Sequence, residues 1–281
     1  MSLETNMSNA FYDPELYSRK IGYAPRFDRV YADRLAGAPA GSTVMELGCG
    51  TGDVLLPLAR NGVRAIGVDS SADMLGHFER RLRDEPTAVS ERVRLIRETL
   101  PDVPPAGPVD AVILPNDIVS HLVDDAAVDR LFANVRSALG HDGVLLLDVA
   151  RFDVVELGSI AAAPHGLTRP HGFFPYTGDH HLRVEEHLTY DSASGVADSV
   201  MRYEVLDADA EVRSVRYRKL RLRPRRTREI TLALRLAGFE VTDVEDVGHL
   251  LGKGPGEPGD VLVQARPARR SSTVPHGGGT R

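Results

Sequence analysis

Between residues 43 and 149, short apolar segments alternate with longer segments whose apolar residues recur at helical spacing. The short segments are rich in aliphatic residues and bounded by Gly, Pro, Asp or Asn, which is typical of buried strands. Strands are predicted at Thr43–Leu47, Ala65–Val68, Val93–Ile96, Val109–Leu114 and Val144–Val149, and helices at Asp53–Asn61, Ser71–Arg83 and Asp124–Leu139. Because crossovers join strands that alternate with helices, the pattern predicts a doubly wound, mostly parallel α/β sheet.

Capping residues mark the ends of two predicted helices. Ser70 or Ser71 suits the N-cap of the second helix, because a serine hydroxyl accepts hydrogen bonds from the free amides of a first turn. Gly140 suits the C-cap of the third helix, where glycine most easily adopts left-handed angles. We therefore expect the third helix to end just before Gly140.

The rhythm changes after Ala150. Residues 158–181 are rich in glycine, proline and histidine and are predicted to form a loop. Three strands with short turns between them follow, which predicts an antiparallel insert after the fifth strand. These strands are expected at Leu182–Tyr190, Val196–Leu206 and Val212–Leu222. A helix at Thr227–Leu236, ended by Gly238, and strands at Phe239–Val244 and Val261–Gln264 then complete the first sheet.

Composition and charge place the chain among soluble globular proteins. It has 281 residues, of which 42% are hydrophobic, enough for a sizeable core. A net charge of -6 argues against general adhesion to nucleic acid or anionic membrane. Cys49 is the only cysteine, which excludes an internal disulfide and a zinc site built from several thiolates. Without a signal-like start or a long apolar run, we expect a cytoplasmic protein that does not span a membrane.

The stretch VMELGCGTGD places Gly48, Gly50 and Gly52 directly after a predicted strand. Closely spaced glycines let the backbone turn sharply and let a ligand lie against bare peptide. A dinucleotide loop needs a third glycine where this chain has Asp53. Glu46 and Asp53 also flank the loop, and carboxylates so close together repel a pyrophosphate. The loop therefore favours a cationic ligand.

The loop ELGCGTG, followed by VDSSADML after the second strand, resembles the first two motifs of class I S-adenosylmethionine-dependent methyltransferases. The resemblance implies a Rossmann-like fold in which the glycine loop lies beneath the methionine part of S-adenosylmethionine. It also implies that Asp69 accepts hydrogen bonds from both ribose hydroxyls, which one carboxylate can do at once. The implied reaction is in-line methyl transfer to N or O of a small metabolite, such as a natural-product intermediate.

Weaker matches extend this resemblance. Glu98 stands where many relatives have an acid, and Thr99 and Leu100 stand where the family contacts the adenine. Asn116 follows the fourth strand, where cofactor and acceptor meet. The insert and a tyrosine-rich start are similar to glycine N-methyltransferases and amino-sugar N,N-dimethyltransferases, whose first helix closes over the cofactor. The predicted cofactor contacts are Tyr17, Tyr23, Glu46, Gly48, Cys49, Gly50, Gly52, Asp53, Asp69, Ser70, Met74, Glu98, Thr99, Leu100 and Leu114.

Methyl transfer requires the protein mainly to align the reacting groups and to exclude water. A base is needed only when the acceptor arrives as an alcohol, a phenol or an ammonium. His121 is the candidate base, with Asn116 and Asp117 as orienting residues. His121 could instead be a helix-end histidine bonded to a backbone carbonyl, and Asn116 and Asp117 could likewise be purely structural.

The histidine-rich segment after residue 158 has two interpretations. Its histidines lack the short fixed intervals of metal ligand sets, so no metal is predicted. Histidine beside Phe and Tyr suits the mouth of a partly apolar acceptor pocket. The predicted acceptor contacts are Tyr12, His171, Phe173, Phe174 and Tyr176.

The basic run RSVRYRKLRLRPRRTR at 213–228 could form a nucleic-acid stripe. Val215, Tyr217, Leu220 and Leu222 interleave with its cations, however, as in a half-buried strand whose arginines face solvent. This favours a solvated sheet face or a subunit surface, and an anionic acceptor could use part of it. Nucleic acid is therefore not an expected partner, whereas a homo-oligomer formed through the insert is.

The resulting domain organisation has five parts. A helical lid is expected at 1–40, a Rossmann-like cofactor core at 41–150 and the acceptor-binding or oligomerising insert at 151–225. Residues 226–265 complete the core sheet, and 266–281 form a disordered tail. Alternative functions are an NAD-dependent oxidoreductase, an RNA-directed methyltransferase and a non-catalytic binding protein for S-adenosylmethionine.

Overall fold

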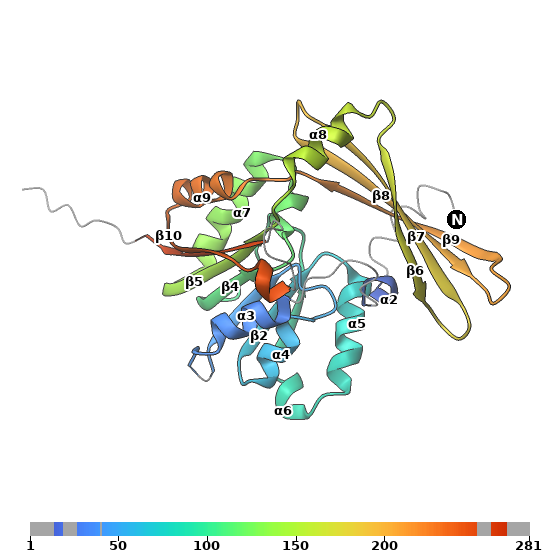
Figure 1. Ribbon diagram of the computed structural model, residues 1–281. Coiled ribbons are helices and arrows are strands. Elements are labelled where there is room, and N and C mark those ends of the chain that lie inside the picture. The colour runs from blue at the N-terminus through green and yellow to red at the C-terminus, as the bar shows by residue number, and fades with distance from the viewer. Residues whose placement is uncertain (1–13, 19–26, 40, 252–259, 269–281) are drawn as a thin grey trace, which may run out of the picture.

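The computed structural model describes residues 14–18, 27–39, 41–251 and 260–268 (Figure 1). A seven-stranded sheet has the order β10-β11-β5-β4-β1-β2-β3. Strands β1 to β5 are parallel, and β11 runs antiparallel to β5 and β10. The strands are β1 Thr43–Leu47, β2 Arg64–Asp69, β3 Val93–Arg97, β4 Val109–Leu114, β5 Leu139–Val149, β10 Phe239–Asp246 and β11 Val261–Pro267. The predicted mostly parallel Rossmann-like sheet is confirmed.

Helices cover both faces of this sheet, each through an apolar stripe. One face packs against α3 Phe27–Leu35, α4 Leu55–Arg60 and α5 Ala72–Arg83, with the short α6 Thr87–Ser90 against α4 and α5. The other face packs against α7 Asp125–Ala138 and α9 Thr227–Leu236. Phe78 of α5 and Phe132 of α7, both fully buried, fill the two layers.

The insert is a second, antiparallel sheet of order β6-β7-β8-β9, preceded by a helix. Its elements are α8 Val154–Ala162, β6 Leu167–Pro175, β7 His181–Asp191, β8 Val196–Leu206 and β9 Val212–Leu222. The predicted loop at 158–181 is therefore wrong, because α8 and β6 occupy much of it. Pro170 is tolerated because β6 is an edge strand, and Gly172 sits where a bulge shifts the register with β7.

Two predicted element ends are also corrected, those at Gly140 and Arg266, and the choice between Ser70 and Ser71 is settled. Gly140 does not cap α7, because Leu139 already has extended angles (φ -74°, ψ 139°) and begins β5. Ser71, rather than Ser70, caps α5, its hydroxyl accepting from the Met74 amide at 3.2 Å. Arg266 belongs to β11 and not to the tail. In each case, a strand pairing or a hydrogen bond that the sequence does not reveal determines where the element begins or ends.

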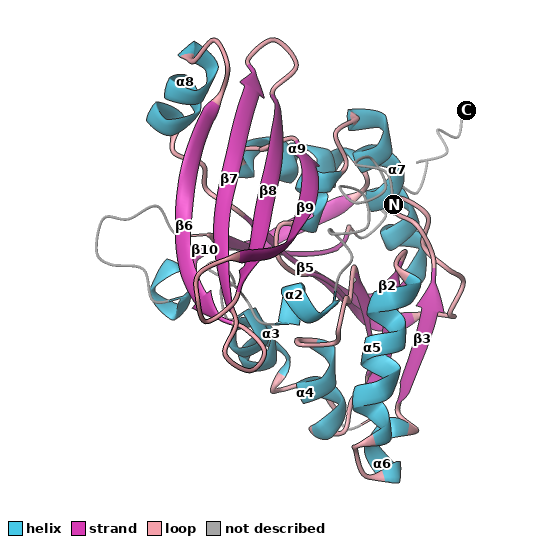
Figure 2. Cartoon of the chain, turned by 90° about the vertical axis from the view of Figure 1, so that its right-hand side faces the viewer, coloured by secondary structure: helices cyan, strands magenta, loops and turns pink. Residues whose placement is uncertain are grey.

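The insert turns one face toward the core, and a short N-terminal helix, α2 Pro14–Ser18, lies beneath it (Figure 2). Leu16 of α2 packs against this inner face. Its apolar partners there are Leu182, Val184, Met201, Tyr203 and Val205, with Phe174 and Tyr176 at the margin. Among the described residues, none of the helices has the length and apolar character needed to cross a membrane.

Candidate active site

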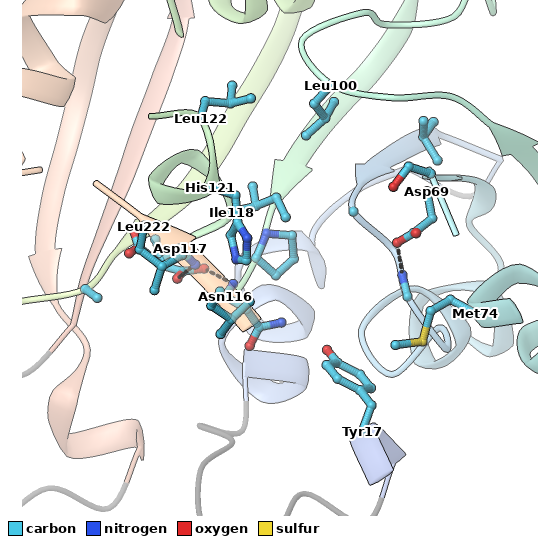
Figure 3. A pocket seen from close by; sticks show the side chains of 18 of the residues that line it. Tyr17, Asp69, Met74, Leu100, Asn116, Asp117, Ile118, His121, Leu122 and Leu222 are labelled. Carbon is cyan, nitrogen blue, oxygen red and sulfur yellow. Dashed lines mark hydrogen bonds between the residues drawn. The ribbon is translucent and has the colours of Figure 1, made fainter. Parts of the chain in front are cut away.

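A cavity of about 550 Å³ lies between the carboxyl ends of the core strands and the inner face of β9 (Figure 3). The carboxyl edge of a parallel sheet is where open α/β folds bind ligands, because the loops leaving neighbouring strands diverge there. Of the predicted site residues, the cavity brings together Tyr17, Gly48, Gly50, Asp69, Ser70, Met74, Glu98, Thr99, Leu100, Asn116, Asp117 and His121. Figure 3 shows Asp69 and Met74 across from Asn116 and His121, with Tyr17 between the two sides.

The glycine loop forms one wall, and its backbone requires glycine. Gly48 and Gly52 have φ of 78° and 83°. A Cβ on Gly48 would meet Ile118 at 2.8 Å, and one on Gly52 would meet Phe78 at 2.3 Å. The loop is therefore packed tightly against the protein on one side. On the cavity side, the nearest atom to a Cβ on Gly50 belongs to Tyr17, at 3.7 Å, so bare peptide faces the space.

Asp69 anchors the loop to the end of β2. Its Oδ2 accepts from the Gly50 amide and its Oδ1 from the Ser71 amide, both at 2.8 Å. Burial raises the pKa of Asp69, while its backbone hydrogen bonds oppose that rise. Each carboxylate oxygen can accept a second hydrogen bond. The side chain thus fixes the loop and can still receive two hydroxyls from the cavity.

Among the described residues, five predicted cofactor contacts do not line the cavity: Glu46, Cys49, Gly52, Asp53 and Leu114. Cys49, Gly52 and Leu114 are buried behind the wall, and Glu46 is only 2% exposed. Burial, then the charges of Asp53 and Asp69, raise the pKa of Glu46 well above its usual range. Its Oε2 has no hydrogen-bond partner within the part of the chain that the structure describes.

Asp53 and Glu46 were expected to act together on a cation. Asp53 instead pairs with Arg81 at 2.7 Å, and the guanidinium partly offsets its charge. The same guanidinium donates to the Thr51 carbonyl at 2.6 Å and so braces the glycine loop. Tyr12 and Tyr23, the other predicted contacts from the N-terminal segment, lie outside the described residues.

The chain leaves β4 in an unusual conformation. Asn116 and Asp117 have φ of 62° and 50°, in the left-handed region that non-glycine residues rarely adopt. Asp148 of β5 accepts from both amides, at 2.9 Å from Asn116 and 2.7 Å from Asp117. Tyr31 of α3 donates to the same carboxylate at 2.7 Å. Asp148 and Tyr31 were missed from the sequence because no motif marks them.

Burial shifts the titration of three groups in this half of the cavity. Burial, with a smaller contribution from Asp148, raises the pKa of Asp117 to about 8, although the Ser120 hydroxyl donates to it at 2.5 Å. Burial also raises the pKa of Asp148 to about 7. His121 ends the 3-10 helix Ile118–His121, and burial, then the Arg218 charge, lower its pKa to about 4. His121 is therefore neutral at neutral pH.

The opposite wall comes from β9, which the sequence places in the acceptor-binding or oligomerising insert without marking any of its residues as site residues. Arg218, Leu220 and Leu222 line the cavity. Side chains alternate along a strand, so Arg218 shares the leucines' face and the expectation that the arginines face solvent is wrong for it. The sequence shows that apolar and basic side chains alternate along this strand, but it does not show which face of the strand the rest of the protein covers.

Other arginines of the run at 213–228 bind within the protein. The Arg223 amide donates to the Ser120 carbonyl at 2.8 Å, and its side chain pairs with Asp125 at 2.7 Å. Arg225, only 5% exposed, donates to the Val119 carbonyl and to Asp125, both at 3.2 Å. These bonds join the end of β9 to the start of α7, and they leave fewer cations for a nucleic acid.

The four predicted acceptor contacts within the described residues, His171, Phe173, Phe174 and Tyr176, lie outside the cavity lining. His171 contacts Glu186 at 2.9 Å, and Phe173 is 68% exposed. Phe174 and Tyr176 pack at the margin of the inner face, beside Leu16. The histidine segment forms strand β6, whose edge position in the sheet separates it from β9 and the cavity. No cluster of three metal-ligating side chains occurs among the described residues.

Comparisons with known proteins agree with this geometry. A family model described as "Methyltransferase domain" matches residues 44–143. The putative methyltransferase YqeM of Bacillus subtilis (strain 168) is 26% identical over 144 residues, 50% of this chain and 56% of that protein. The chain spans about half the length of the curated relatives it matches, or less.

Solved structures resemble the chain over nearly its whole length. The CcbJ methyltransferase from Streptomyces caelestis has a TM-score of 0.71 at 18% identity, covering 92% of this chain and 98% of that one. CalS10, an amino pentose methyltransferase from Micromonospora echinaspora, has a TM-score of 0.66 at 21% identity, covering 90% and 95%. At such identities the likeness concerns the fold. Residues 44–143 therefore match a methyltransferase domain, and the chain shares its fold with S-adenosylmethionine-dependent methyltransferases.

Proposed function

We propose that the protein uses S-adenosylmethionine to methylate nitrogen or oxygen of a small molecule. The observation that carries the proposal is the pairing of the open peptide at Gly50 with the Asp69 carboxylate in one cavity of the methyltransferase domain. A dinucleotide fingerprint is absent from this loop, which weighs against the oxidoreductase alternative.

The residues present fit this cofactor. Bare peptide at Gly50 offers room for the methionine part, and Asp69 retains lone pairs for the ribose hydroxyls. Thr99 and Leu100 line the same side of the cavity and would contact the adenine. When bound, S-adenosylmethionine supplies an electrophilic methyl group on a sulfonium. The chain's part is to hold the acceptor in line and to exclude water.

The acceptor half combines apolar and polar groups. Ile118, Leu122 and Phe152 line it together with the β9 wall. Asn116, Asp117, His121 and Arg218 add polar groups to the same lining. Such a lining suits a partly apolar small molecule that is oriented by a few hydrogen bonds.

Asp117 is better suited than His121 to act as the base for an ammonium acceptor. General-base catalysis is most efficient when the pKa of the base lies near the working pH. The pKa of Asp117 is raised to about 8, whereas that of His121 is lowered to about 4. An acceptor nitrogen is favoured for this reason, and the amino pentose specificity in the name of CalS10 agrees with it. His121 then orients the acceptor as a neutral imidazole.

The test combines binding and turnover. Calorimetry of the full chain with S-adenosylhomocysteine and with NAD should show saturable binding of the first alone. Mass spectrometry of amines, amino sugars and phenols incubated with the protein and S-adenosylmethionine should reveal an acceptor that gains a methyl group. Binding of NAD without S-adenosylhomocysteine would overturn the proposal, and binding without any methylated acceptor would favour the non-catalytic alternative.

A further inference from the structure

We propose that Tyr31, which does not line the cavity, positions the acceptor-side residues Asn116 and Asp117 through the carboxylate of Asp148. This inference deepens the proposed function and rests on it for the identity of the acceptor side. Its geometric part stands on hydrogen bonds among residues far apart in the sequence.

The first step is the exit from β4. Pro115 has no amide to continue the ladder with β5, and two left-handed residues follow it. Neither is glycine, so both pay a steric penalty unless neighbouring groups hold them. The register that pairs Leu114 with Leu147 brings Asp148 next to Pro115. The Asp148 carboxylate therefore takes the place of the hydrogen bonds that would otherwise continue the pairing of β4 with β5.

The second step is the pair of amides. Successive left-handed residues turn consecutive N–H groups to one side, forming a concave anion site. Asp148, only 1% exposed, fills it, with one oxygen bonded to the Asn116 amide and the other to the Asp117 amide. Charge-assisted hydrogen bonds of this kind are strong. With the amides held, the side chains of Asn116 and Asp117 are directed toward the cavity that both line.

The third step is Tyr31. It is fully buried in α3, and its hydroxyl lies 2.7 Å from Asp148 Oδ1 and 3.2 Å from the Leu114 carbonyl. Burial and the nearby Asp148 charge raise the pKa of Tyr31 well above its usual range, so it remains a donor. Because the Tyr31 hydroxyl is fixed, the Asp148 carboxylate has one orientation in which it can accept from the Asn116 and Asp117 amides as well. Tyr31 thus acts on the acceptor side from the layer behind the sheet.

The experiment compares Tyr31→Phe, Asp148→Asn and a matched control in the full chain. Asp110→Asn is the control, because Asp110 also accepts a backbone amide, that of Thr43 at 2.7 Å, but at the other end of β4. NMR follows the amide shifts of Asn116 and Asp117 against pH. Asp117, with a pKa raised to about 8, titrates beside these amides as well, so the signature of Asp148 is the component near pH 7. That component should be present in the parent and should move to higher pH in Tyr31→Phe, because the Tyr31 hydrogen bond lowers the pKa of Asp148. It should disappear in Asp148→Asn, where only the titration from Asp117 remains.

Function supplies the second readout. In Tyr31→Phe, kcat should fall about tenfold, the scale of one hydrogen bond, when it is measured with the acceptor that mass spectrometry identifies. The affinity for S-adenosylhomocysteine should stay unchanged. Unaltered amide titration in Tyr31→Phe, or an equal loss of kcat in the control, would overturn the inference. Failure of the parent to bind S-adenosylhomocysteine would instead remove the proposed function and leave the amide result standing.

Discussion

Asp69 contributes to the cofactor site in two ways, and both contributions to the binding free energy are lost when it is replaced. It orders the glycine loop through the Gly50 amide and, under the proposed function, also receives the ribose hydroxyls. Asp69→Ala should weaken binding of S-adenosylhomocysteine by about 1.5–3 kcal/mol, the scale of lost charged hydrogen bonds. Calorimetry measures this, with Asp73→Ala as the control because Asp73 is exposed in the first turn of α5. Equal affinity of both variants would remove Asp69 from the cofactor site.

Asp117 predicts the pH dependence of turnover. With a folded-state pKa raised to about 8, it is mostly protonated at neutral pH and gains its basic form as pH rises. The kcat/KM for an ammonium acceptor should therefore increase through about pH 8. Ser120→Ala should move this limb to higher pH, because the serine hydroxyl hydrogen bond lowers the pKa of Asp117. A limb that persists unchanged in Asp117→Asn would assign the titration to another group.

At the scale of elements, the junction between β9 and α7 fixes one wall of the site relative to the other. Arg225 is buried there, bonded to the Val119 carbonyl and to Asp125. Arg225→Ala should lower the free energy of unfolding by about 1–3 kcal/mol, because it leaves a buried carbonyl with one donor fewer. Arg221→Ala, at an exposed pair with Asp198 3.7 Å away, should change it by less than about 1 kcal/mol. Urea unfolding distinguishes the two, and equal effects would contradict this account of the junction.

Elements also separate what the sequence predicts from what it does not. The core strands could be predicted closely, because buried parallel strands are short apolar runs between turn residues. Strand β6 was missed because Pro170 and Gly172 are local loop signals that only its edge position and bulge make tolerable. Arg218 was missed because alternation gives two faces without saying which is covered. Asp148 was missed because its role depends on amides more than thirty positions away.

At the scale of the molecule, the cavity joins two sheets and a short N-terminal helix. Leu16 of α2 packs on the insert, while its neighbour Tyr17 covers the glycine loop. A ligand between these parts must therefore order both of them. Because S-adenosylhomocysteine binds only the folded state, a concentration of 100 times its Kd should stabilise the chain by about 2.7 kcal/mol. Thermal unfolding with and without the ligand would measure this.

The distribution of that stabilisation is more informative than its size. Amide hydrogen exchange reports local opening, so a ligand that touches both walls should slow exchange in the glycine loop and in β9 together. Asp69→Ala, at ligand concentrations that saturate it, should retain the slowing in β9, because β9 lines the wall of the cavity opposite Asp69. Slowing confined to the core would mean that the insert wall forms only around the acceptor. Hydrogen exchange would then be measured again with the acceptor present. Slower exchange in β9 under that condition would assign the acceptor half of the site to β9.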